Sequence, residues 1–166
     1  MKQYIGTKII NAKPMDRLAY NVFRGWKLPD DENGADEGYL VEYKDGGEPN
    51  TKEYKGYVSW SPKEQFENAY KQSGEMSFGD AITYLKLGYK VTRKGWNGKE
   101  MFLILVEGTD AIKPYPNTPY DNVVKHTKQE KINILPHIDM HTAQGDILCG
   151  WLASQTDMLS KDWEIV

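Results

Sequence analysis

Alternating apolar and polar positions predict short strands in the first part of the chain, separated by turns. The stretches rich in β-branched and aromatic residues are 4–10, 38–43 and 56–60. Between the first two, residues 16–24 are expected to form a helix, with Asp16 as its N-cap and Gly25 at its end. Pro14 is expected to end the strand before it.

Two further helices are predicted to meet near the middle of the chain. Ser61-Pro62-Lys63-Glu64 has the composition of a helix start, with Ser61 as the cap. The next helix begins at Ser77, which can act as its N-cap, and Asp80 stands in its first turn. Because one helix ends where the other begins, we place a domain boundary there, between an N-terminal module (1–74) and a C-terminal domain (75–166).

In the second half, strands are predicted at residues 89–93, 101–107, 132–142 and 147–151. Asn97-Gly98 is a strong turn signal, which puts Trp96 at the tip of a hairpin, where its ring would support little of the core. The alternative is a ring folded back onto the hairpin. Residues 108–131 are polar and rich in proline, so they are expected to be a long irregular excursion.

Near its end the chain combines an aromatic ring with a helix start. Ser154 is the predicted N-cap of a short helix, so free backbone N–H groups would lie beside the indole of Trp151. Such a corner suits a planar polar ligand, with a nucleobase on the ring and a phosphate or ribose oxygen at the helix start. The alternative is that Trp151 belongs to the core and the polar residues only form a cap.

The pattern of short strands and short helices predicts an α+β fold, with a small antiparallel sheet in the C-terminal domain. The 166 residues are 39% hydrophobic, which is enough for a core. Residues 1–74 carry 11 basic and 12 acidic side chains and residues 75–166 carry 10 and 12, an even balance that argues against binding to duplex nucleic acid. No stretch has the length of a signal or membrane segment, and Cys149 is the single cysteine, so a reducing cytoplasm is expected.

One pattern offers metal ligands. His137, Asp139 and His141 follow at a period of two, so all three would project from the same face of a strand. The alternative is a polar outer face. No serine stands in a nucleophile elbow and no glycine-rich loop is present to hold phosphate, so no catalytic residue is assigned.

Three motifs in the second half resemble one known family. They are Met76-Ser77-Phe78-Gly79, Arg93-Lys94-Gly95-Trp96-Asn97-Gly98-Lys99, and the stretch from Trp151 to Val166. In this order they are similar to the second family of phage Thoeris anti-defence proteins. The resemblance implies a homotetramer in the cytoplasm of the infected bacterium that sequesters glycocyclic ADP-ribose, the messenger made by TIR-domain enzymes, without cleaving it. Some members also hold cyclic dinucleotides, which would block CBASS signalling as well.

The resemblance also implies the residues of the messenger site. The aromatic walls would be Phe78, Trp96 and Trp151. The polar ends would be Asn97, Ser154 and Asp157. Apart from the resemblance, Arg93, Lys94 and Lys99 concentrate positive charge around Trp96, which makes them candidate phosphate contacts. No metal, cofactor or catalytic residue is implied. Residues 1–74 resemble a module that accompanies this domain in other phage proteins, and no function is attached to it.

Two other functions are compatible with the sequence. The first is a metal-dependent phosphodiesterase that uses His137, Asp139 and His141. The second is a phage structural or regulatory adaptor, in which the tryptophans form the core of an interface.

Overall fold

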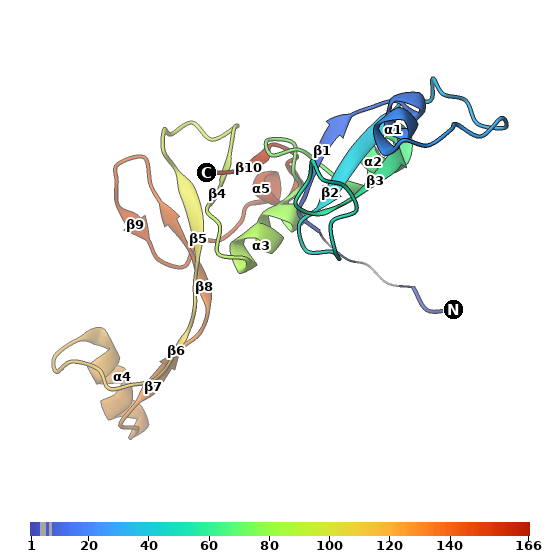
Figure 1. The fold of residues 1–166 in the computed structure, drawn as a ribbon. Coiled ribbons are helices and arrows are strands. Elements are labelled where there is room, and N and C mark those ends of the chain that lie inside the picture. The colour runs from blue at the N-terminus through green and yellow to red at the C-terminus, as the bar shows by residue number, and fades with distance from the viewer. Residues whose placement is uncertain (4–5, 7) are drawn as a thin grey trace. The chain divides into compact units, whose positions relative to one another are not determined.

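The computed structural model describes residues 1–3, 6 and 8–166, shown in Figure 1. They form two compact units, Met1–Lys71 and Gln72–Val166. The division falls a few residues before the boundary predicted at residue 74. Each unit combines antiparallel strands with short helices, which confirms the α+β class. Among the described residues, every helix is too short or too polar to cross a membrane.

The first unit is a three-stranded antiparallel sheet with two helices. Its strands are β1 (Ile10–Pro14), β2 (Gly38–Tyr43) and β3 (Tyr57–Pro62), in the order β1-β2-β3. Its helices are α1 (Arg17–Arg24) and α2 (Lys63–Ala69). Tyr20, Leu40 and Val58 form its buried cluster.

Helix α1 begins and ends as predicted. The side chain of Asp16 accepts a hydrogen bond from the N–H of Ala19 at 2.7 Å. Gly25 has a φ of 69° and ends the helix. At α2, by contrast, the expected cap is wrong. Ser61 is still paired in β3, so Pro62 is the N-cap and no side chain caps the helix.

The first strand lies later than predicted. Of the stretch 4–10, residues 4, 5 and 7 lie outside the described residues, and the strand that is described begins at Ile10. Pro14 is the last residue of this strand, so the strand ends there as predicted. β1 is at the edge of the sheet, so the N–H that proline lacks is not needed by a neighbouring strand.

The second unit is built on a five-stranded antiparallel sheet in the order β10-β4-β5-β8-β9. The strands are β4 (Val91–Arg93), β5 (Phe102–Val106), β8 (His137–His141), β9 (Ile147–Leu148) and β10 (Trp163–Ile165). Helix α3 (Phe78–Lys86) packs against β4, β5 and β10. Its apolar face places Ala81 and Leu85 in a buried cluster with Val91, Leu103 and Trp163.

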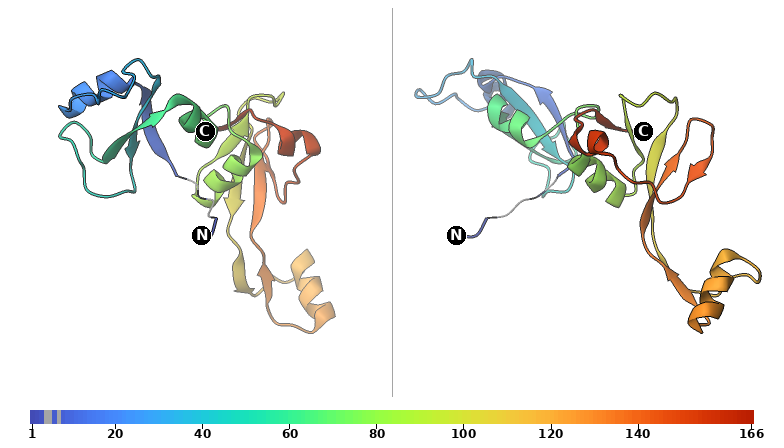
Figure 2. Two further views of the ribbon diagram at one scale, coloured as in Figure 1. Left: turned by 90° about the vertical axis from the view of Figure 1, so that its right-hand side faces the viewer. Right: turned by 180° about the vertical axis from the view of Figure 1, so that it is seen from behind.

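The segment predicted to be irregular is in fact an ordered arm. Strands β6 (Thr109–Ile112) and β7 (Ile132–Ile134) pair with each other, and helix α4 (Pro119–Thr127) lies at the end. In Figures 1 and 2 they extend the β5–β8 hairpin away from α3. The prediction failed because proline was counted as a helix breaker, whereas Pro119 stands in the first turn, where it is tolerated. The single strand predicted over 132–142 is likewise two strands, β7 and β8.

Candidate functional site

The predicted cap at the end of the chain is present and is a complete capping box. Helix α5 (Gln155–Leu159) begins after Ser154, whose Oγ accepts a hydrogen bond from the N–H of Asp157 at 3.1 Å. In return, Asp157 Oδ2 accepts from the N–H of Ser154 at 3.0 Å and from its hydroxyl at 2.6 Å. Ser154 is therefore held as the N-cap, as the sequence predicted.

The other carboxylate oxygen of Asp157 connects this corner to β4 and to the loop that follows it. Asp157 Oδ1 accepts a hydrogen bond from Arg93 Nη1 at 2.7 Å and from Trp96 Nε1 at 3.0 Å. Burial raises the pKa of this carboxyl, but the bonds from Ser154, Arg93 and Trp96 outweigh it and bring the pKa down to about 2. Both oxygens of Asp157 are engaged within the protein, so this side chain positions its neighbours.

Arg93 is bound to a second carboxylate. Its Nε donates to Asp162 Oδ1 at 2.9 Å, and Asp162 also accepts from the N–H of Gly95 at 2.8 Å and from the hydroxyl of Ser160. The guanidinium of Arg93 holds the pKa of Asp162 at about 2. With its charge offset by two carboxylates, Arg93 is less suited to a phosphate contact than expected from the sequence.

Four aromatic rings gather around this network. Trp163 is fully buried, and its ring centroid lies 5.5 Å from those of both Phe78 and Trp96 and 6.4 Å from that of Trp151. The rings of Trp96 and Trp151 meet edge to face at 6.1 Å. Aromatic rings favour this edge-to-face arrangement, because the positive edge of one ring is attracted to the negative face of the other. Phe78, Trp96 and Trp151 are partly exposed, so they form the accessible side of the cluster.

The ring of Trp96 packs back onto this cluster. This agrees with the second of the two interpretations of the sequence, in which the ring folds back and does not stand at the tip of a hairpin. A tight hairpin with Trp96 at its tip is wrong, because β4 ends at Arg93, β5 begins only at Phe102, and Val91 and Leu103 are their one registered pair within the described strands. Asn97 follows on the loop and is exposed.

The structure thus brings most of the predicted site residues to one corner of the second unit. Phe78, Trp96 and Trp151 contribute rings, and Ser154 is exposed beside them. Lys94 and Lys99 are exposed on the loop after β4. Asp162 and Trp163, which hold Arg93 and the rings in place, were not identified from the sequence. Their position in the third motif was the only feature of the sequence that pointed to them.

The histidines of β8 are engaged in other ways. His141 stacks on Phe102 with ring centroids 4.7 Å apart, and its Nδ1 lies 3.0 Å from the carbonyl oxygen of Glu100. Asp139 accepts a hydrogen bond from the N–H of Gly150 at 2.9 Å and lies 3.4 Å from His137 Nε2. In the part of the chain that the structure describes, no group of three such residues could hold a metal ion.

The segment that forms this corner matches a known family model. Residues 76–166 match the model described as a Thoeris anti-defense 2-like domain. The chain belongs to the Thoeris anti-defense 2 family. A curated relative, the Thoeris anti-defense 2 protein of Bacillus phage SP01, is 39% identical over 92 residues, which is 55% of this chain and 96% of the relative. The resemblance of the three motifs is therefore confirmed, and the first unit lies outside the family match.

Proposed function

We propose that this member of the Thoeris anti-defense 2 family sequesters glycocyclic ADP-ribose in the cytoplasm of the infected bacterium and does not cleave it. The observation that carries the proposal is the corner of partly exposed rings, Phe78, Trp96 and Trp151, next to the exposed N-cap of α5. Aromatic faces bind nucleobases, with about 1–3 kcal/mol per stacked base. The adenine of an ADP-ribose messenger can be held between two of these rings.

The polar groups of the corner favour binding over catalysis. A general base works best with a pKa near the operating pH, but Asp157 and Asp162 have pKa values of about 2 and both are bound to Arg93. The hydroxyl of Ser154 donates to Asp157 Oδ2, but a carboxyl with a pKa of about 2 is too weak a base to activate it. This arrangement supports retention of an intact ligand.

The phosphates of the messenger would be bound by lysines. Lys94 and Lys99 are exposed on the loop that carries Trp96, and among the described residues neither takes part in an ion pair. Arg93, in contrast, is held by two carboxylates. In this proposal Lys94 and Lys99 contact phosphate, Asn97 and Ser154 bind the polar edges, and Arg93 and Asp157 hold Trp96 in place.

Exposed apolar side chains next to the rings support a site completed by another copy of the chain. Leu152, which follows Trp151, is 89% exposed, and Leu159 at the end of α5 is 77% exposed. Exposed apolar residues that cluster beside a binding surface are typical of an interface. We therefore propose a homotetramer with messenger sites between subunits.

Calorimetry tests this proposal. The full chain should bind glycocyclic ADP-ribose with nanomolar affinity, since two stacked rings and several charge-assisted bonds exceed the association cost. Lys99→Gln should weaken binding by roughly tenfold, as expected for one charge-assisted bond, whereas Lys128→Gln, on the arm, should leave it unchanged. Failure to bind any cyclic ADP-ribose isomer or cyclic dinucleotide would favour the adaptor function instead.

A further inference from the structure

A pocket in the first unit has no part in the messenger site and lies outside the family match. It has a volume of about 410 Å³. Its walls are the rings of Tyr20, Trp26 and Trp60, and its polar lining is Arg17, Asn21 and Glu32. Aromatic walls with a few polar groups, in a volume of this size, are typical of sites for small ligands or single side chains.

The walls are fixed by the fold of the unit. Trp60 donates its indole N–H to the carbonyl of Met15 at 2.8 Å, and its ring lies against Gly38, where a Cβ atom would come within 2.4 Å of the ring. Tyr20 is buried in the core cluster and meets the ring of Trp26 nearly at right angles, with centroids 6.2 Å apart. Trp26 itself is 53% exposed, so much of its ring remains open.

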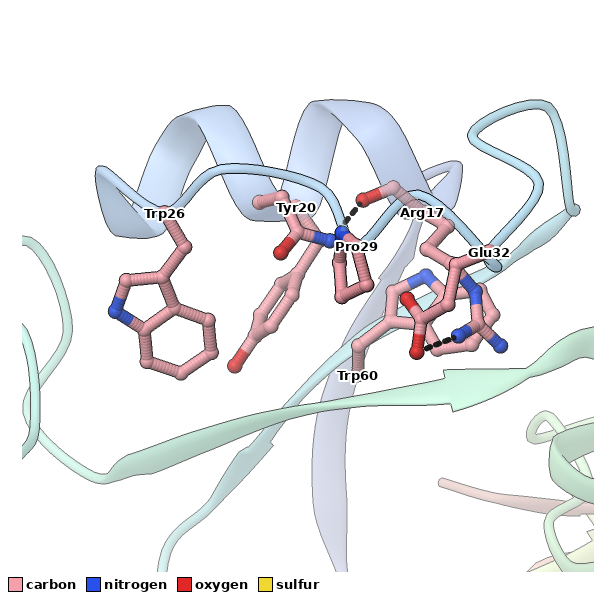
Figure 3. A pocket seen from close by; sticks show the side chains of 7 residues that line it. Arg17, Tyr20, Trp26, Pro29, Glu32 and Trp60 are labelled. Carbon is pink, nitrogen blue, oxygen red and sulfur yellow. Dashed lines mark hydrogen bonds and ion pairs between the residues drawn. The ribbon is translucent and has the colours of Figure 1, made fainter.

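Figure 3 shows how these groups are arranged. Trp26 lies at one end of the pocket, and Arg17 and Glu32 lie over Trp60 at the other end, with Tyr20 and Pro29 between them. A ligand in the middle of the row would therefore meet aromatic surface on one side and the carboxylate on the other.

Two acceptor atoms of the pocket are available to a ligand. Glu32 pairs with Arg17 through Oε1 at 2.7 Å, and within residues 8–166 its Oε2 makes no hydrogen bond or ion pair. Asn21 donates its side-chain amide N–H to the carbonyl of Arg17 at 2.9 Å, and within the same residues its Oδ1 makes no hydrogen bond. A buried donor, Arg17 Nε, also makes no hydrogen bond within the described residues, but it pairs with Asp36 Oδ2 at 3.5 Å, so the two acceptors favour a ligand that donates hydrogen bonds.

The excess of acidic side chains around the pocket disfavours an anion. Residues 16–37 contain three basic and six acidic side chains. The rings already attract cations from the chain itself: the guanidinium of Arg17 lies 4.5 Å from the ring centroid of Trp60, and that of Arg24 lies 4.3 Å from that of Trp26. Guanidinium groups stack well on tryptophan because they are planar and weakly hydrated.

We propose that this pocket binds a guanidinium group, supplied either by a small free guanidine or by an arginine side chain of a partner peptide. The group stacks on the open part of Trp26 and donates N–H bonds to Glu32 and Asn21. This activity is independent of the messenger site, so it stands or fails separately from the proposed function.

The test follows the indole N–H signals of the full chain by NMR during titration. Agmatine should shift one indole signal, the one that Trp26→Ala removes, with a Kd on the order of 1 mM, appropriate to a single group. 1,4-Diaminobutane, with the same two positive charges and the same spacer but no planar group, should bind at least about fivefold more weakly, and adenosine monophosphate should not compete. A Gly-Arg-Gly peptide distinguishes the sources: if it matches agmatine the ligand is an arginine side chain, and if it does not the ligand is a free guanidine.

Two matched pairs of variants test whether Trp26 and Glu32 bind the guanidinium group. With backbone amide signals as the readout, Trp26→Ala should weaken agmatine binding by about two- to fivefold or more, whereas Tyr57→Ala, which removes another exposed ring, should not. Glu32→Gln should weaken it more than Asp31→Asn, a change of equal charge on the same loop but outside the lining. Should Glu32→Gln unfold, the Trp26 pair still decides. The proposal is wrong if agmatine shifts no indole signal, if the adenine nucleotide binds more tightly, or if the two variants of either pair behave alike.

Discussion

Asp157 connects three segments of the second unit through one carboxylate. It accepts hydrogen bonds from Ser154 at the start of α5, from Arg93 at the end of β4 and from Trp96 on the following loop. Asp162 holds the same arginine from the other side. The orientation of the exposed rings therefore depends on two ionised carboxylates, which makes the corner sensitive to acid.

Acid should weaken the second unit in a defined range of pH. The pKa values of Asp157 and Asp162 are lowered from 3.8 to about 2 in the folded protein, so their contribution to stability is complete above about pH 4 and is lost as the pH falls toward 2. Each carboxyl contributes about 2 kcal/mol, from 1.36 kcal/mol per pKa unit. Urea unfolding should show a gap between the wild type and Asp162→Asn that is widest above pH 4 and closes below it. A gap that stays constant from pH 6 to pH 2 would contradict this account of the ion pairs.

Trp96 should matter for both stability and binding. Because its ring packs on Trp163, Trp96→Ala should lower the free energy of unfolding by about 2 kcal/mol, and it should weaken messenger binding by a factor of about 5 to 150. Trp96→Phe keeps a ring but loses the N–H donor to Asp157, so it should lower the free energy of unfolding by about 1–2 kcal/mol. It should weaken messenger binding less than Trp96→Ala does. Thermal unfolding and calorimetry measure the two effects. Unchanged affinity in Trp96→Ala would exclude the ring from the site.

Among the elements, the arm formed by β6, α4 and β7 is the least expected part of the fold. Local signals in the sequence were sufficient for α1, α3 and α5, because a capping residue and the helical period lie within one segment. The arm was missed because its prolines and polar residues resemble a loop until Thr118 is recognised as an N-cap. Similarly, no local signal connects Arg93 to Asp157 and Asp162, since these residues meet only after the sheet has formed.

Removing the arm should leave the second unit folded. The buried cluster under α3 contains no residue of the arm, and Val106 and His137 are already paired at the end of the β5–β8 hairpin. If residues 107–136 are replaced by Asn-Gly, a two-residue turn suited to such a hairpin, the unfolding free energy should change by no more than about 1 kcal/mol. Circular dichroism melting measures this. Loss of the cooperative transition would mean that the arm is part of the folding core.

At the level of the whole molecule, the two units contain separate buried clusters, and only the second matches the family model. A fragment that starts at Gln72 should therefore fold and bind messenger within about tenfold of the full chain, or about 1.4 kcal/mol. A fragment that starts at Glu75 should be less stable, because Ser73 and Gly74 bond to Ile165 and Trp163 of β10. Chromatography and calorimetry compare the two. An insoluble fragment from Gln72, or one that binds more than a hundredfold more weakly, would show that the halves fold as one domain.

The central claim is that the messenger is held intact. The most direct measurement is to incubate the full chain with a stoichiometric amount of glycocyclic ADP-ribose, remove free ligand by gel filtration, denature the protein by heat and identify the released nucleotide by mass spectrometry. We expect the protein fraction to carry the ligand and to release it with its mass and retention time unchanged. A linear or smaller product would identify an enzyme and contradict the proposal.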